Sequence, residues 1–177
     1  MTNATATAPA AIKTRILFLC TGNSCRSQMA EGWANHLGSP WLEAQSAGIE
    51  AHGKNPRAIA VMREAGVDIA QQESTRVTPE MLAWADLVVT VCGHADEHCP
   101  VLPASVKKLH WPLNDPAKAI GDIQERMSAA GDRTSDAASE EAVMAMFRAT
   151  RDEVRRRVET LVDDTRHGKS NDVQRTR

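Results

Sequence analysis

The sequence predicts an α/β fold, a three-layer sandwich in which a four-stranded parallel sheet is flanked by helices. The first observation is that short apolar or β-branched runs alternate along the chain with segments of helical periodicity, as in parallel sheets covered on both faces. The second is that 177 residues, 42% of them hydrophobic, suit a single domain with one core. We therefore expect one domain over residues 14–162, between flexible tails at 1–13 and 163–177.

The first strand and the first helix flank a segment that contains glycine. Residues 16–19 are apolar and follow Arg15, and the run has the length of a buried strand. After the segment, apolar residues recur at helical spacing, namely Met29, Ala30, Trp33, Ala34 and Leu37. The sequence thus predicts a strand, a turn and a helix in direct succession.

Alternation and capping residues place the next elements. Residues 42–48 alternate between apolar and polar positions, which predicts the second strand. Asn55 followed by proline is a typical helix start, and Gly66 closes that helix. Thr78, also followed by proline, opens a short helix that we expect to end at Trp84.

The second half of the chain predicts two more strands and a long helix. Residues 87–91 are rich in β-branched side chains, and residues 107–111 form a short fourth strand. Residues 119–140 have weak periodicity and are interpreted as a surface insertion. The helix at 141–161 is predicted from an apolar stripe made by Val143, Met146, Phe147, Val154, Val158 and Leu161. On its polar side we expect i, i+4 ion pairs, Asp152 with Arg156 and Glu153 with Arg157.

The segment between the first strand and helix has the composition of an oxyanion-binding loop. Gly22 and Asn23 tolerate the positive φ that such a loop requires, and the following helix start attracts anions. Arg26 can bind two oxygens of a tetrahedral anion at once. Cys20 is the candidate nucleophile, which we expect to be ionised at neutral pH beside these donors. The candidate substrate-binding residues are Thr21, Gly22, Asn23, Ser24, Cys25, Arg26 and Ser27.

Cys20, Cys92 and Asp115 each lie just past the end of a predicted strand. Because ligands of parallel sheets bind at the carboxyl ends of the strands, we expect these side chains to converge on one edge. A loop of this kind can cleave phosphate esters, with Cys20 as nucleophile, Arg26 stabilising the equatorial oxygens and Asp115 as general acid.

Cys92 and Cys99 allow three interpretations. They could pass a disulfide onward from Cys20, they could join His94 and His98 in a zinc site, or they could be small buried hydrophobes. Arsenate has the same tetrahedral shape as phosphate, but arsenic accepts two electrons from thiols whereas phosphorus does not. Extra thiols are superfluous in a phosphatase and necessary in a reductase, so the loop favours the redox interpretation.

Composition excludes several classes of partner. A net charge of −2 gives no reason to expect binding to nucleic acid or to an anionic membrane. No apolar run approaches the ~20 residues of a membrane span, and the first dozen residues lack the features of a secretory signal. Four cysteines in such a chain indicate a reducing compartment, and we expect a cytoplasmic protein.

These residues give the chain a specific resemblance. It resembles the arsenate reductases built on the low-molecular-weight protein tyrosine phosphatase fold, particularly the thioredoxin-coupled type, from about residue 14 to residue 162. The matching stretches are CTGNSCRSQMAEG at 20–32, SAGIE at 46–50, HGKNP at 52–56, DLVVTVC at 86–92, CP at 99–100, HW at 110–111 and NDPA at 114–117.

The resemblance implies a thiol relay. Cys20 attacks arsenate while Asp115 protonates the leaving oxygen, and Cys92 then attacks Cys20 and releases arsenite. Cys99 attacks Cys92 in turn, and thioredoxin reduces the exposed Cys92–Cys99 disulfide. Cys25 has no redox role by this resemblance. The implied function is arsenic detoxification, with arsenate as substrate, thioredoxin as electron donor and possible residual phosphatase activity.

The chain also departs from the family pattern. Some members bind potassium through residues that match Asn23, Glu31 and Ser46, together with a Thr and an Asp. Glu73 and Thr75 stand at those last two positions, so the ion's ligand set is incomplete and we expect no required cofactor. The chain has no Tyr and lacks aromatic residues after Asp-Pro, which counts against a phosphotyrosine substrate. The alternatives are a low-molecular-weight phosphatase with a weak redox role or none, and a Cys/His metal-binding module.

Overall fold

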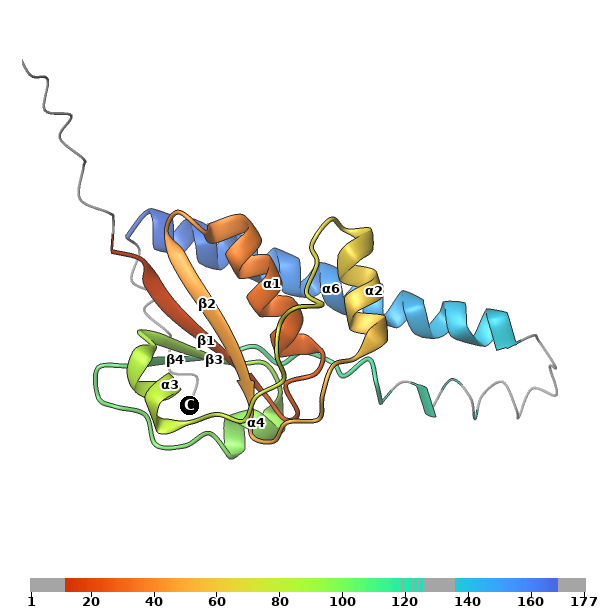
Figure 1. Ribbon diagram of the computed structural model, residues 1–177, viewed down its shortest axis with the longest axis horizontal. Coiled ribbons are helices and arrows are strands. Elements are labelled where there is room, and N and C mark those ends of the chain that lie inside the picture. Colours follow the sequence, from red (N-terminus) through yellow and green to blue (C-terminus); the bar gives the residue numbers. More distant parts are fainter. Residues whose placement is uncertain (1–11, 119, 122, 124, 126–135, 169–177) are drawn as a thin grey trace, which may run out of the picture.

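The computed structural model describes residues 12–118, 120, 121, 123, 125 and 136–168 (Figure 1). It contains a four-stranded parallel sheet in the order β2-β1-β3-β4, flanked by helices, which confirms the predicted fold class. The strands are β1 (Thr14–Cys20), β2 (Leu42–Gly48), β3 (Leu87–Thr90) and β4 (Lys107–His110). The helices are α1 (Arg26–Gly38), α2 (Pro56–Glu64), α3 (Pro79–Trp84), α4 (Gly93–Glu97) and α6 (Asp136–Arg166).

β1 is one of the two inner strands of the sheet. It pairs with β2 on one side and β3 on the other, so its apolar run from Ile16 to Leu19 is fully buried. In register, Cys20 lies opposite Gly48, and Leu19 lies opposite Thr90. The carboxyl ends of three neighbouring strands therefore meet at the edge where β1 enters the loop.

The capped helices begin where the sequence predicts. Asn55 Oδ1 accepts hydrogen bonds from the backbone N–H groups of Arg57 and Ala58 at the start of α2. Thr78 Oγ1 accepts from Met81 N at the start of α3. α4, which begins directly after Cys92, is an element that the apolar pattern does not predict.

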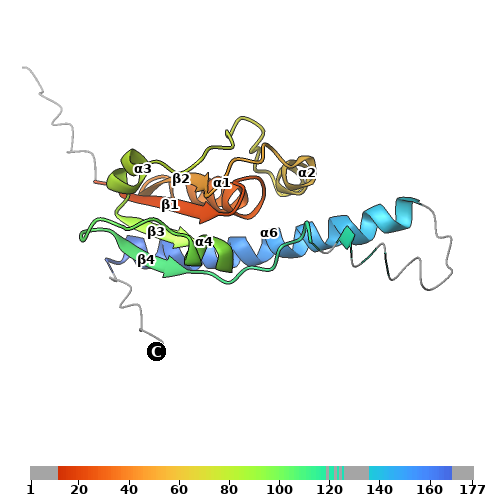
Figure 2. The same ribbon diagram turned by 90° about the horizontal axis from the view of Figure 1, so that it is seen from below.

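α6 is the long helix that packs against α1 and α2 and runs past both (Figure 1 and Figure 2). Five of the six residues of its predicted stripe are buried, but Met146 is 41% exposed, so this one assignment is wrong. The pair predicted between Asp152 and Arg156 is also wrong. Asp152 bonds Arg151 instead, whereas Glu153 pairs with Arg157 as predicted.

The ends of α6 differ from the predicted helix at 141–161. α6 starts at Asp136, inside the predicted insertion, and extends to Arg166, inside the predicted C-terminal tail. Most of the insertion and most of both predicted tails lie outside the described residues. Within the described part of the chain, no helix is long and apolar enough to cross a membrane.

Candidate active site

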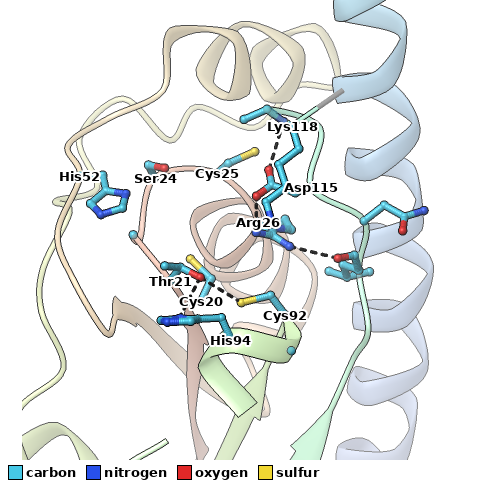
Figure 3. A pocket seen from close by; sticks show the side chains of 15 residues that line it. Cys20, Thr21, Ser24, Cys25, Arg26, His52, Cys92, His94, Asp115 and Lys118 are labelled. Atoms are coloured by element: carbon cyan, nitrogen blue, oxygen red, sulfur yellow. Dashed lines mark hydrogen bonds and ion pairs between the residues drawn. The ribbon is translucent and has the colours of Figure 1, made fainter. Parts of the chain in front are cut away.

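A cavity of about 670 Å³ lies over the carboxyl ends of β1 and β3 (Figure 3). It collects side chains from four separate parts of the chain. It is lined by Cys20, Thr21, Gly22, Ser24, Cys25, Arg26, His52, Cys92, Gly93, His94, Leu113, Asn114, Asp115, Ala117 and Lys118. The structure thus brings Cys20, Cys92, Arg26 and Asp115 to one cavity.

The loop after β1 curls around the Cys20 sulfur. Asn23 N donates to Cys20 Sγ at 3.1 Å, and Ser27 Oγ lies 2.8 Å from the same sulfur. Asn23 has a φ of 45°, the left-handed conformation that asparagine tolerates better than most residues. Both groups can donate a hydrogen bond to the sulfur, as the predicted role of Cys20 as nucleophile requires.

The segment that follows β2 holds the loop in this shape. Ile49 N donates to Cys20 O, Glu50 N to Thr21 O, and His52 N to Gly22 O. Gly48 is required at this junction, because a Cβ there would overlap the carbonyl oxygen of Glu50. A main-chain ladder therefore fixes three consecutive carbonyl groups of the loop.

Arg26 and Asp115 form another part of the cavity wall and bond to each other. Arg26 is 8% exposed, and its guanidinium donates to Leu113 O at 3.0 Å and to Asp115 Oδ2 at 2.8 Å. Asp115 Oδ1 accepts from Ala117 N at 3.1 Å. Both carboxylate oxygens are thus fixed at the cavity.

Cys92 lies in the same cavity as Cys20 and is buried. Cys92 directly precedes α4, and its Sγ accepts a hydrogen bond from Ala95 N at 3.4 Å. Thr21 Oγ1 also lies 3.4 Å from Cys92 Sγ. Cys99 follows α4 and lies outside the cavity, half-buried. Burial raises the pKa of the Cys99 thiol; the charge of Lys108 opposes this effect and that of Asp96 adds to it. Two of the three predicted relay thiols are therefore together in this structure.

Cys25 lines the cavity, whereas Asn23 does not. Cys25 lines it but is otherwise buried, and burial raises the pKa of its thiol, so it is a poor nucleophile. Asn23 is fully buried and turns its side chain away, donating from Nδ2 to Ser27 Oγ and Ser46 Oγ. Of the predicted substrate-binding residues, Asn23 and Ser27 are absent from the cavity lining that the structure describes, and their side chains hydrogen-bond within the loop instead.

The residues that the resemblance suggests as potassium ligands hydrogen-bond to one another. Ser46 Oγ donates to Glu31 Oε2 at 2.6 Å and accepts from Asn23 Nδ2 at 2.8 Å, while Asn23 Oδ1 accepts from Thr75 N. Thr75 adds no negative charge to this set. These residues bond to one another in this structure. That no cofactor is required stays a prediction.

The structure adds three ionisable side chains to the cavity that the sequence patterns do not single out for this site, those of His52, His94 and Lys118. The ring of His52 covers Gly22, where a Cβ would overlap it, and its Nε2 contacts Glu50. His94 contacts Thr21, and Lys118 lies beyond Asp115. From the sequence alone, His94 is considered only as a possible zinc ligand and His52 only as part of a matching stretch. The signal that could have placed them in this cavity is position, since each of the three residues follows a strand whose carboxyl end lies at this edge. In the described ranges, no group of three or more His, Cys, Asp or Glu side chains is placed to hold a metal.

Known proteins are similar to this chain in sequence and share its fold. The family model for low molecular weight phosphotyrosine protein phosphatase matches residues 15–172. An arsenate reductase of Bacillus licheniformis is 49% identical over 152 residues, which cover 85% of this chain and 96% of that protein.

Two solved structures extend the comparison. One is an arsenate reductase in the phosphate binding state, with a TM-score of 0.63 and 31% identity over 86% of this chain and 98% of that one. The other is a low molecular weight protein tyrosine phosphatase from T. tengcongensis. Its TM-score is 0.64 with 24% identity, covering 86% of this chain and 99% of that one, a likeness of fold.

Proposed function

Because this chain belongs to the low molecular weight phosphotyrosine protein phosphatase family, we propose that it is an enzyme that uses the family's oxyanion loop to reduce arsenate to arsenite. The observation that carries the proposal is the second buried thiol. Cys92 lies in the wall of the cavity that holds Cys20, and phosphate ester hydrolysis has no use for it. Relatives named arsenate reductase share about half of the residues of this chain over most of its length, which supports the same conclusion.

The first step adds Cys20 to the arsenic atom. The Cys20 thiolate attacks arsenate, Arg26 binds the oxygens that carry the developing charge, and Asp115 protonates the oxygen that leaves as water. The product is a thioester-like S–As bond at Cys20. Asp115 suits this role because Arg26 and Ala117 N hold its carboxylate at the cavity.

The second step transfers the electrons. The Cys92 thiolate attacks Cys20 Sγ, an S–S bond forms, and the S–As electron pair stays on arsenic, which leaves as arsenite. Cys99 then attacks Cys92, and the resulting disulfide is reduced by thioredoxin. This last donor and a role in cytoplasmic detoxification are part of the proposal and rest on the resemblance of the sequence.

Phosphate ester hydrolysis is the second candidate function. Cys20, Arg26 and Asp115 suffice for it, since water can resolve a phosphocysteine without another thiol. The described lining of the cavity contains no Phe, Tyr or Trp, while Lys118 and two histidines stand around it. This rim suits a small inorganic anion better than an aryl ester, so we expect hydrolysis to be slow.

Thiol substitutions separate the two functions. In an assay that couples arsenate to NADPH oxidation through thioredoxin and its reductase, we expect turnover by the wild type and none by Cys92→Ser. Cys92→Ser should still hydrolyse an aryl phosphate at the wild-type rate, which shows that its loop is intact. Cys99→Ser should release one equivalent of arsenite and then stop. Continuous turnover by either variant, or none by the wild type, would defeat the proposal.

A further inference from the structure

Two contacts of the Thr21 side chain in the cavity have no part in the steps above. The hydroxyl of Thr21 lies between two groups, 3.4 Å from Cys92 Sγ and 3.4 Å from His94 Nδ1 (Figure 3). A threonine hydroxyl donates one hydrogen bond and accepts others. It can therefore accept from the Cys92 thiol while it donates to a neutral His94.

We propose that His94 accepts, through the Thr21 hydroxyl, the proton that Cys92 gives up before it attacks Cys20. The inference rests on the proposed reduction of arsenate and adds a positioning residue to it. The Cys92 S–H bond breaks as its proton passes to Thr21 Oγ1, and the Thr21 hydroxyl proton passes to His94 Nδ1. Thr21 is unchanged at the end, and a Cys92 thiolate stands beside a His94 imidazolium.

The surroundings of the two groups explain why such a route is useful. Cys92 is 6% exposed, so water has little access to its proton, whereas His94 is exposed and can return the proton to solvent. The thiolate, not the thiol, attacks a sulfur atom. Electrons balance as before, because the Cys92 thiolate supplies the pair that forms the S–S bond and the S–As pair stays on arsenic.

Other titratable groups also face His94. His98 stacks on it, with ring centroids 4.2 Å apart, and donates from Nδ1 to the carbonyl oxygen of His94. Glu50 and His52 belong to the segment that follows β2. The hydrogen bond and charge of His52 lower the pKa of the Glu50 carboxyl most, and the charge of His94 lowers it further. His98 is a matched control, because it directly follows α4 and stacks on His94, and none of the hydrogen bonds in the described part of the chain joins it to Thr21.

The test is the pH dependence of Cys92 alkylation by iodoacetamide, without arsenate, followed by peptide mass spectrometry. All proteins carry Cys20→Ser, so that Cys20 does not compete for the reagent. Asparagine at position 94 keeps an acceptor near the position of Nδ1 but cannot take a proton. We expect His94→Asn to slow alkylation about tenfold near neutral pH and to shift its pH profile upward, whereas His98→Asn matches the parent.

Three outcomes would overturn the inference: no change in His94→Asn, an equal loss in His98→Asn, or a slower rate without a shift of the profile. In the coupled assay with Cys20 present, His94→Asn should lower kcat and leave the KM for arsenate unchanged. A wild type that does not reduce arsenate would defeat the proposed function alone, because the alkylation experiment does not use arsenate.

Discussion

At the scale of single residues, the fork of Arg26 joins two separate parts of the cavity wall. One nitrogen donates to Leu113 O and another to Asp115 Oδ2, which a lysine ammonium cannot do in the same plane. We expect Arg26→Lys to lower kcat/KM for arsenate about 10²-fold, because removing one preorganised donor from an oxyanion site has that order of effect. The coupled assay measures this loss.

Arg63→Lys is the matched control for Arg26→Lys. It makes the same change on the surface of α2, where the Arg63 side chain is 62% exposed and pairs with Asp68. We expect wild-type activity from it. Activity of Arg26→Lys close to the wild type would contradict the assignment of Arg26 to the anion.

Glu31 behind the loop gives a pH dependence of stability. Burial raises the pKa of its carboxyl, and the hydrogen bond from Ser46 opposes this effect. A carboxyl whose pKa is higher folded than unfolded binds more protons in the folded state, so the free energy of unfolding falls as pH rises between those two pKa values. Glu31→Gln removes the charge and keeps an oxygen for Ser46.

We expect Glu31→Gln to be more stable than the wild type near neutral pH, with the difference shrinking as pH falls towards about 4. Urea unfolding at a series of pH values measures it. Glu73→Gln, which removes a surface carboxylate whose side chain is 75% exposed, controls for loss of charge alone. A difference between Glu31→Gln and the wild type that does not vary with pH would refute this account.

The sequence predicts the residues whose chemistry is local. Cys20 and Arg26 belong to one loop between a strand and a helix, so their types and spacing indicate an anion site without any tertiary information. The contact of Thr21 with Cys92 and the position of His52 over Gly22 depend on how β3 and the segment after β2 reach the same edge. No local pattern encodes those distances, so only the structure provides them.

At the scale of elements, Asn55 caps the start of α2, three residues after His52 of the cavity wall. Asn55 Oδ1 accepts from Arg57 N at 3.0 Å and from Ala58 N at 3.2 Å. We expect Asn55→Ala to lower the free energy of unfolding by about 1 kcal/mol, measured by urea titration, because both amides lose their acceptor. Asn55→Asp keeps the acceptor and should stay within a few tenths of a kcal/mol. Equal losses in both variants would show that the cap is not the cause.

Elements with an apolar period or a capping residue are predicted well, and elements without either are not. The range of β2 and the start of α3 agree with the sequence patterns. α4 has five residues, of which Ala95 is buried, so it has no apolar stripe to detect. The first turn of α6 lacks large apolar residues, which explains why the predicted helix starts five residues late, at 141 rather than 136.

At the scale of the whole molecule, the proposed reaction has to carry two electrons from the cavity to the surface. Cys92 precedes α4 and Cys99 follows it, so a wound α4 separates them. A helical rise of about 1.5 Å per residue places their Cα atoms roughly 10 Å apart, whereas a disulfide needs about 4.4–6.8 Å. The Cys92–Cys99 disulfide therefore requires α4 to unwind.

This unwinding has to release the contacts of α4 with the sheet. Asp96 accepts from Thr90 Oγ1 at 2.8 Å and pairs with Lys108 Nζ at 2.8 Å, and Ala95 is fully buried. Unwinding also frees Cys99 from the burial that raises the pKa of its thiol, so the thiolate forms more readily when it is needed. In the proposed relay, the unwinding of α4 and the reactivity of Cys99 are thus linked.

We expect one equivalent of arsenate to convert residues 92–99 from slow to fast amide hydrogen exchange, while β1 and α1 stay protected. Exchange measured by mass spectrometry before and after oxidation tests this, since a short helix that has unwound loses its backbone hydrogen bonds. Cys99→Ser, treated in the same way, stops at the Cys20–Cys92 disulfide and should keep a smaller change in this segment. If the wild type and Cys99→Ser exchange alike after oxidation, the second disulfide does not drive the unwinding, and the route by which the electrons reach thioredoxin has to be different.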